Sequence, residues 1–338
     1  MLGASVVVRY LRFTRGALSQ LSTTKRHVSV LEKLTRAALF LPLYIPAALL
    51  LRGAARLNMS VDLPSSTRMG FSLMCRLTDM IGCYVWLFGE WEPDLTRFIS
   101  GRLHDGDVFI DVGANIGYYS LLAARSVGDG GGVVAVEASP AIFDDLLANS
   151  HADALPDRIR LVNKAASATC GTLTVFSGPH HNAGMSTTLD TRGLHIESTI
   201  EAMPLDEILT SEEITSARII KIDVEGAEPD VLAGMSNLIR SLRPDAEIAV
   251  ELSPRWWPDP NLKPIDVLRP FLADGFKVYK MTNIYSPWRY LWPNDVNAAT
   301  RIRDDELSRR AARLDLVLSR HDGESLPIEP LLDGRRVR

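Results

Sequence analysis

The fold of this 338-residue chain is decided by the stretch Val108-Phe109-Ile110-Asp111-Val112-Gly113-Ala114-Asn115-Ile116-Gly117. An apolar run rich in β-branched residues leads into a turn with two glycines, and Ile116–Arg125 then shows helical spacing. At the carboxyl end of a parallel strand, glycines let the backbone approach a ligand, and the following helix N-terminus meets its anionic part. The stretch therefore predicts a ligand-binding strand, turn and helix.

A second apolar run, Val133–Glu137, ends in a carboxylate twenty residues after Gly117. A carboxylate at the end of the second strand of such a fold can accept hydrogen bonds from both hydroxyls of a ribose. Together the two strands predict the nucleoside-binding half of a site.

The glycine spacing of the loop and its acid indicate which nucleoside-containing ligand it binds. A pyrophosphate binder is expected to show G-x-G-x-x-G, whereas Gly113 and Gly117 form only G-x-x-x-G beside the acid Asp111. A carboxylate there would repel a pyrophosphate, but it suits a ligand with an ammonium group and a sulfonium. We therefore predict S-adenosyl-L-methionine as the cofactor. NAD or FAD and a purely structural turn are the alternatives.

Outside this unit, apolar β-rich runs alternate with helical stretches, which predicts βαβ units. The expected strands are Val108–Val112, Val133–Glu137, Ile159–Val162, Ile219–Val224, Glu247–Leu252 and Phe276–Met281. The expected helices are Ile116–Arg125, Ala141–Asn149, Glu228–Ile239 and Pro264–Leu272. Gly171–Met203 is expected to be an insertion between the third and fourth strands, Arg301–Arg313 a charged helix and Leu314–Leu318 a last strand. The expected fold class is α/β, with a doubly wound, mostly parallel sheet.

Composition excludes several classes of protein. A net charge of -4 gives no overall basic field, so we do not expect a nucleic acid partner. Three cysteines are too few for a disulfide framework, and the seven histidines show no metal-binding spacing, so no metal site built on cysteine or histidine is expected.

The N-terminal segment 1–58 is strongly basic. Nine basic residues and one acid give it a net charge of +8, and Ala37–Leu51 within it is uncharged and mostly apolar. That run is shorter than the roughly 20 residues of a spanning helix. Three interpretations stay open: a packed helical subdomain, a segment on an anionic membrane surface, and a targeting peptide. We expect a cytoplasmic protein, and peripheral contact with the inner face of the membrane is compatible with the basic segment.

Several motifs, in this order and spacing, resemble the FkbM family of methyltransferases over residues 90–252. They are Gly89–Pro93, Asp107–Ser120, Glu137–Pro140, Lys164–Ala166, Pro204–Glu207 and above all Lys221-Ile222-Asp223-Val224-Glu225-Gly226-Ala227-Glu228. The resemblance implies a class I methyltransferase (Rossmann-like) fold. It also implies cofactor contacts: Asp111, Gly113, Asn115 and Gly117 around the methionine part, Glu137 on the ribose and Ala165 near the adenine. Glu92 is either a further cofactor-site acid or the start of a capping helix.

The chemical half of the site is expected at the ends of the fourth and fifth strands. A hydroxyl acceptor needs a base within hydrogen-bond reach, and Asp223 ends the fourth strand on the same face as Lys221. We predict Asp223 as the general base or acceptor anchor, with Glu225 and Glu251 as its partners. The alternatives are a structural Lys221–Asp223 ion pair and a divalent cation held by Asp223 and Glu251.

Taken together, these features predict an S-adenosylmethionine-dependent O-methyltransferase acting on a hydroxyl of a saccharide, glycolipid or secondary metabolite. The alternative is a non-catalytic protein of this fold that serves as a membrane-associated scaffold. Four tryptophans either offer their faces to a sugar ring or pack in the core or at a subunit interface: Trp256, Trp257, Trp288 and Trp292. The expected domains are a helical extension over 1–88, the methyltransferase domain over 89–322 and a tail over 323–338.

Overall fold

The computed structural model of the protein describes residues 2–21, 29–57, 59–152, 156–178, 186–190, 193–292, 298–309 and 311–327. The chain divides into two compact units. The first unit consists of Met1–Pro93, His180–Gly184 and Asn283–Asn297, and the second of Asp94–Pro179, Met185–Thr282 and Ala298–Arg338. The domain boundaries expected from the sequence stay a prediction.

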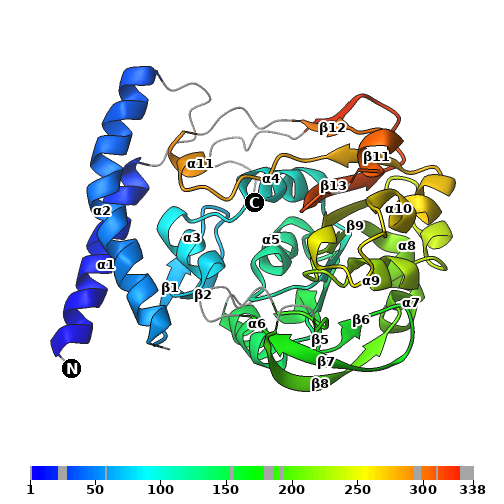
Figure 1. Ribbon diagram of the computed structural model, residues 1–338, viewed down its shortest axis with the longest axis horizontal. Helices are drawn as coiled ribbons and strands as arrows, with labels where there is room; N and C mark the ends of the chain where they lie inside the picture. Colours follow the sequence, from blue (N-terminus) through cyan, green and yellow to red (C-terminus); the bar gives the residue numbers. More distant parts are fainter. Residues whose placement is uncertain are drawn as a thin grey trace. The chain divides into compact units, whose positions relative to one another are not determined.

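The second unit is built on one large sheet. Among the described residues it has nine strands in the order β14-β12-β11-β13-β10-β9-β3-β4-β5 (Figure 1). The strands are β3 (Val108–Val112), β4 (Gly132–Val136), β5 (Ile159–Val162), β9 (Ala217–Ile222), β10 (Glu247–Leu252), β11 (Lys277–Lys280), β12 (Ala299–Arg301), β13 (Leu314–Ser319) and β14 (Ser325–Leu326). The five strands from β5 to β10 are mutually parallel, whereas β13 runs antiparallel to both of its neighbours, β10 and β11.

Helices cover both faces of this sheet. The side chains of each strand alternate between the two faces, so both faces carry residues that the helices bury. Ile110 and Val112 of β3 belong to one buried apolar cluster with Val231 and Phe271. Asp111, between them in sequence, instead points toward α5 and accepts a hydrogen bond from Ser120. The helices of this unit are α4 (Pro93–Arg102), α5 (Tyr118–Ser126), α6 (Pro140–Ala152), α7 (Leu205–Ile208), α8 (Ser211–Ser216), α9 (Glu228–Gly234), α10 (Pro264–Ala273) and α12 (Asp304–Leu307), with 3₁₀ turns η1 (Pro156–Arg158), η3 (Ile239–Ser241) and η4 (Pro254–Trp256). The predicted fold class, a doubly wound α/β sheet, is confirmed.

A smaller sheet interrupts the alternation between β5 and β9. It has the strand order β6-β8-β7, with β6 (Ala165–Ala166), β7 (Gly171–Ser177) and β8 (His195–Met203). The insertion expected over residues 171–203 is therefore confirmed, since β7 and β8 form its antiparallel pair.

One predicted helix was wrong over most of its length, and another was predicted too long. The expected helix Arg301–Arg313 begins in strand β12, and only Asp304–Leu307 is helical. Its charges gave no continuous apolar stripe to bury, while the backbone of Ala299–Arg301 pairs with β11 and β14. The expected helix Glu228–Ile239 ends at Gly234 and is followed by η3.

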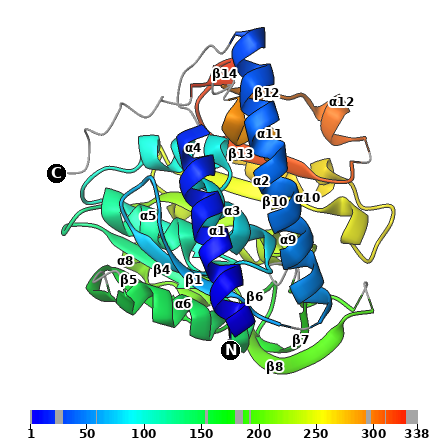
Figure 2. The same cartoon turned by 90° about the vertical axis from the view of Figure 1, so that its left-hand side faces the viewer.

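The first unit contains α1 (Leu2–Leu21), α2 (Val30–Arg56), the hairpin of β1 (Asp62–Ser66) and β2 (Ser72–Arg76), α3 (Met80–Phe88) and α11 (Trp288–Leu291). Helices α1 and α2 lie side by side (Figures 1 and 2), and the Tyr10 hydroxyl donates to the Leu43 carbonyl oxygen at 3.3 Å. The buried ring of Phe40 packs against Phe88 and Trp288. Trp288 thus contributes to the aromatic packing of this unit.

Candidate active site

The loop after β3 brings the two halves of the site together. The backbone N–H groups of Gly113 and Ala114 both donate to the Val136 carbonyl oxygen, at 2.9 and 3.0 Å, which ties the loop to β4. Gly113 has a φ of 76°, and a Cβ there would lie 1.8 Å from the Asp223 carbonyl oxygen. Only glycine therefore lets the loop after β3 meet the loop after β9.

The second half of the loop leads into α5 and reaches Glu137. Asn115 has a left-handed backbone with a φ of 52°, and its N–H donates to Glu137 Oε2 at 2.9 Å. Gly117 caps α5 with a φ of 91°, and a Cβ at this position would lie 2.7 Å from Leu146 Cδ1. The loop is thus held between α6 and the end of β4.

Glu137 is buried at the carboxyl end of β4, and each of its carboxylate oxygens accepts one backbone N–H. Oε2 accepts from Asn115 and Oε1 from Ser139 at 2.9 Å. Burial raises the pKa of Glu137 to about 6, although both hydrogen bonds lower it. Since a carboxylate oxygen has two lone pairs, each can accept a further hydrogen bond from a hydroxyl.

Asn163 was not predicted as a site residue. Its Nδ2 donates to the Glu137 carbonyl oxygen at 2.8 Å and so fixes the segment before Lys164-Ala165-Ala166 beside Glu137. Ala165 itself is buried in β6. The only sequence signal for Asn163 was its position directly before that motif.

Asp111 and Lys221 form a buried pair at the centre of the sheet. Lys221 Nζ lies 3.2 Å from Asp111 Oδ1, and it also donates to the Gly113 carbonyl oxygen at 3.2 Å. The second oxygen of Asp111 accepts from Ser120 Oγ at 2.7 Å. Burial raises the pKa of Asp111, while Lys221 lowers it. Lys221 therefore links the carboxylate of Asp111 to the loop, because its ammonium group bonds to both.

Asp223 is the more accessible acid of this group. Its N–H donates to the Val112 carbonyl oxygen at 3.0 Å, which fixes the start of the loop after β9. Its carboxylate lies 3.9 Å from Lys221 Nζ, and its side chain is 37% exposed. Among the described residues, the acids Asp111, Glu137 and Asp223 thus interact with the single ammonium group of Lys221, so carboxyl groups outnumber amino groups in this set.

The loop from Glu225 to Glu228 is tightly anchored. Glu225 has a φ of 52°, and its carbonyl oxygen accepts a hydrogen bond from Thr187 Oγ1 at 3.1 Å. The carboxylate of Glu228 accepts from the N–H groups of Gly226 and Ser253, at 2.5 and 3.2 Å, and from Trp257 Nε1 at 2.8 Å. Burial raises the pKa of Glu228 to about 7. The sequence predicted Glu228 only as the first residue of a helix, but its side chain links the loops after β9 and β10.

Glu251 lies on β10 with a cation beside it. Arg313 Nε is 3.7 Å from Glu251 Oε1, and Arg313 Nη2 is 2.9 Å from Asp315 Oδ2. Glu251 and Asp315 are paired across β10 and β13, so the guanidinium lies between two carboxylates. Among the described residues, no group of three or more histidine, cysteine, aspartate or glutamate side chains could hold a metal ion.

Glu92 belongs to the first unit, whereas the other candidate residues belong to the second. Its carboxylate accepts hydrogen bonds from Asn283 Nδ2 at 2.8 Å and from the Tyr285 hydroxyl. Among the described residues, the non-glycine residues with positive φ are Glu92, Asn115 and Glu225. All three were predicted site residues, and such backbone strain is concentrated at functional sites.

The strand order reverses direction at β3, with β4 and β5 on one side and β9 and β10 on the other. Ligands of open α/β sheets bind outside the carboxyl ends of the strands at such a switch point. The loop after β3, Glu137 after β4 and Asp223 after β9 all lie there. The second unit therefore has the Rossmann-like fold of class I methyltransferases, with the candidate site at its switch point.

Comparison with known proteins identifies the family. Residues 111–278 match the methyltransferase FkbM domain. The chain belongs to the FkbM family of S-adenosylmethionine-dependent methyltransferases.

One characterised relative and two solved structures illustrate the similarity. The hexuronic acid methyltransferase AglP of Haloferax volcanii is 30% identical over 151 residues, which are 45% of this chain and 59% of that protein. The precorrin-6y C5,15-methyltransferase of Geobacter metallireducens GS-15 matches 67% of this chain and 84% of its own at 13% identity, with a TM-score of 0.36. A TehB-like SAM-dependent methyltransferase of Corynebacterium glutamicum matches 67% of this chain and 86% of its own at 12% identity, with a TM-score of 0.34.

Proposed function

We propose that the protein is an O-methyltransferase that transfers a methyl group from S-adenosylmethionine to a hydroxyl of a saccharide. The negative charge balance of the site carries this proposal. The carboxyl groups of Asp111, Glu137 and Asp223 all lie near the ammonium group of Lys221, and this excess of acids favours a sulfonium and an ammonium over a pyrophosphate.

The residues of the second unit fit this cofactor. Glu137 would accept the ribose hydroxyls with the lone pairs that its two backbone N–H partners leave. The loop of Gly113, Asn115 and Gly117 would hold the methionine part, and Asp111 would act on that loop through Lys221. Ala165, in the segment that Asn163 fixes beside Glu137, would contact the adenine. The cofactor supplies a methyl carbon that its sulfonium makes electrophilic.

Asp223 would take the proton of the acceptor hydroxyl. It lies at the carboxyl edge of the sheet, its side chain is partly exposed, and its backbone is fixed by the Val112 carbonyl oxygen. Such a positioned base contributes about 10²–10⁴-fold to rate. Glu225, on the same loop, and Glu251, beside Arg313, would bind other hydroxyls of the acceptor.

A carboxylated sugar is the acceptor that we propose within this class. The relative AglP is a hexuronic acid methyltransferase, which supports an acidic saccharide. Trp256 adjoins the loop of Asp223, since a Cβ on Gly226 would lie 2.9 Å from Trp256 Cβ. The exposed Arg255 guanidinium lies 4.9 Å from the Trp256 ring. The indole offers a face to a sugar ring and the guanidinium a partner to a sugar carboxylate.

Calorimetry and a methyl-transfer assay test this function. We expect binding of S-adenosylmethionine and S-adenosylhomocysteine but not of NAD, and transfer of a labelled methyl group to glucuronic acid glycosides but not to RNA. Arg255→Ala should raise KM for a glucuronide more than for a glucoside, with Arg269→Ala, which changes an exposed arginine of α10, as the matched control. Cofactor binding without transfer to any saccharide would favour a non-catalytic scaffold instead.

A further inference from the structure

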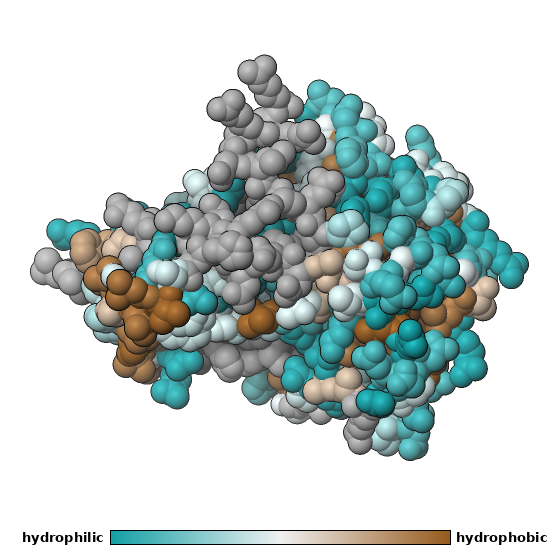
Figure 3. Space-filling view, turned by 90° about the horizontal axis from the view of Figure 1, so that it is seen from above, coloured by the Kyte–Doolittle hydropathy of each residue, from teal (hydrophilic) through white to brown (hydrophobic). Residues whose placement is uncertain are grey.

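The outward side of α2 is apolar over most of its length. Its exposed large hydrophobic residues, which we call the α2 apolar face, are Val30, Leu31, Leu34, Leu39, Leu41, Ile45 and Leu49. They recur at helical spacing, while the opposite side packs into the first unit through Phe40, Ala47 and Leu51. Hydrophobic (brown) side chains gather at the left of Figure 3, where Figure 1 has α1 and α2. A helix in water is expected to expose polar residues, so this face suits a less polar surrounding.

Basic residues flank this face at both ends. Lys33 and Arg36 lie in the first turns of α2, Arg52 and Arg56 lie in the last, and no charged residue occurs between 37 and 51. The acid of this segment, Glu32, is paired with Arg36 at 2.7 Å. Apolar side chains between clusters of arginine and lysine are typical of helices that lie in the interface of an anionic membrane.

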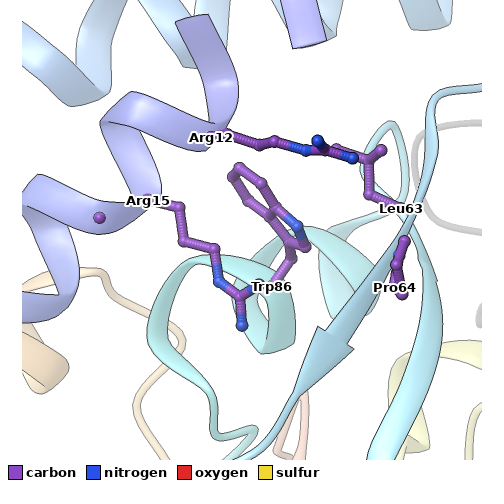
Figure 4. Close-up of a pocket in the computed structure, with 6 residues that line it drawn as sticks. Arg12, Arg15, Leu63, Pro64 and Trp86 are labelled. Carbon is purple, nitrogen blue, oxygen red and sulfur yellow. The ribbon is translucent and has the colours of Figure 1, made fainter. Parts of the chain in front are cut away.

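A basic pocket lies beside α1 in the same unit. It has a volume of about 530 Å³ and is lined by Arg12, Arg15, Gly16, Leu63, Pro64 and Trp86 (Figure 4). Arg15 Nη2 donates to Ser65 Oγ and to the Ser66 carbonyl oxygen, both at 3.2 Å, and its guanidinium lies 5.4 Å from the Trp86 ring. Arg12 is exposed and has no acceptor among the described residues. Two guanidinium groups on one pocket suit a phosphate.

The packing of α2 indicates how it would meet a bilayer. Among the described helices, α2 alone is long and apolar enough to cross a membrane by length and composition, and only 17% of its most apolar window is buried. However, Phe40 is enclosed by Phe88 and Trp288, so one side of the helix is part of a folded protein core. A helix with one packed and one apolar side can lie along a membrane surface with its packed side toward the protein.

We propose that α1 and α2 form a membrane-docking element. The α2 apolar face enters the boundary between headgroups and acyl chains of an anionic bilayer, and Arg12 binds a lipid phosphate at the pocket of the first unit. The net charge of +8 on residues 1–58 is complementary to such a surface. This docking does not depend on the proposed methyl-transfer activity.

Flotation of the full chain with lipid vesicles tests the proposal. The vesicles are phosphatidylcholine alone or an equal mixture with phosphatidylglycerol. We expect the chain to float with the mixed vesicles, and an alkaline wash should release it.

Leu34→Glu and Leu49→Glu, at side chains 64% and 62% exposed, should each weaken binding roughly tenfold. Ile196→Glu, at a 71% exposed residue of β8, is the matched control and should bind like the wild type. Arg12→Ala should weaken binding to mixed vesicles about fivefold and leave binding to neutral vesicles unchanged.

Four outcomes would overturn the proposal. The first is a wild-type chain that does not float with mixed vesicles. The second is full binding by Leu34→Glu and Leu49→Glu while their circular dichroism matches the wild type. The third is a chain that only detergent extracts, since that result indicates a spanning helix. The fourth is a dimer in light scattering that Leu49→Glu converts to a monomer without any effect on flotation, because a second copy would then cover the face.

Discussion

The ammonium group of Lys221 lies 3.2 Å from Asp111 Oδ1, and the two residues face each other in the parallel register of β3 and β9. Removing one partner of a buried ion pair leaves an uncompensated charge. Lys221→Met should therefore lower the free energy of unfolding by about 3–5 kcal/mol in urea titrations. The double variant Lys221→Met/Asp111→Asn should recover part of that loss. A single variant as stable as the wild type would contradict the pairing.

Gly113→Ala should damage the point where the two loops meet. The methyl group would have to share space with the Asp223 carbonyl oxygen, at a φ of 76° that L-residues rarely adopt. We expect a loss of about 2–4 kcal/mol in the free energy of unfolding, together with weaker cofactor binding. Gly132→Ala is the control, because a Cβ there meets nothing within 4 Å. Equal stabilities of the two variants would show that the loops can move apart freely.

Glu137→Gln should weaken binding of S-adenosylhomocysteine by about 1–3 kcal/mol in calorimetry, since one acceptor oxygen becomes a donor. The wild-type affinity should itself fall as the pH drops through about 6, where Glu137 becomes protonated. The exposed acid Glu212 of α8 provides a matched control, Glu212→Gln. An unchanged affinity for Glu137→Gln would remove Glu137 from the ribose site.

Asp223→Asn should lower the turnover of the enzyme while leaving its affinity for the cofactor nearly unchanged. Because the amide cannot take the acceptor proton, we expect turnover to fall by about 10²–10⁴-fold. The dissociation constant of the cofactor should stay within about twofold, since the backbone hydrogen bond to Val112 is retained. Asp230→Asn, at an exposed position of α9, should leave both unchanged. Full activity of Asp223→Asn would move the base to another residue.

Glu228 should give the fold an unusual dependence on pH. Its pKa is raised by burial from 4.5 to about 7, so the folded state binds its proton more tightly than the unfolded state does. Its contribution is fully present below pH 4.5 and is lost as the pH rises to about 7. The stability of the wild type minus that of Glu228→Gln should fall by roughly 3 kcal/mol between these limits. A difference that is flat with pH would mean that Glu228 stays ionised.

The sequence predicted the parts of the fold that depend on local pattern. β3, the turn at Gly113 and β4 follow from neighbouring residues, so their positions agree with expectation. The contact between Lys221 and Asp111 depends on β9 lying beside β3, which only the sheet order determines. The sequence therefore suggested Asp223 as the partner of Lys221, but Asp111 lies closer.

Other contacts could not be found from spacing. Glu228, at the start of α9, accepts hydrogen bonds from Ser253 and Trp257 in the segment after β10, and no periodicity in the sequence indicates that these segments meet. The contact of Asn163 was equally hidden from the sequence pattern. Its side chain donates to the carbonyl oxygen of Glu137, which follows the neighbouring strand β4. The helix expected over 301–313 was wrong because charge alone does not distinguish an exposed helix from the edge of a sheet.

Strand β13 also has a consequence for biosynthesis. A ribosome delivers β10 and β11 before β13, yet β11 pairs in the sheet only with β12 and β13 among the described residues. Until residues 314–319 emerge, β10 has an open edge and β11 has no connection to the nascent sheet. The strands around Asp111, Glu137 and Asp223 can pair early, but the described sheet is complete only once β13 and β14 have been delivered. A stop codon shortly before Leu314 would thus leave an exposed β10 that invites aggregation of the truncated chain.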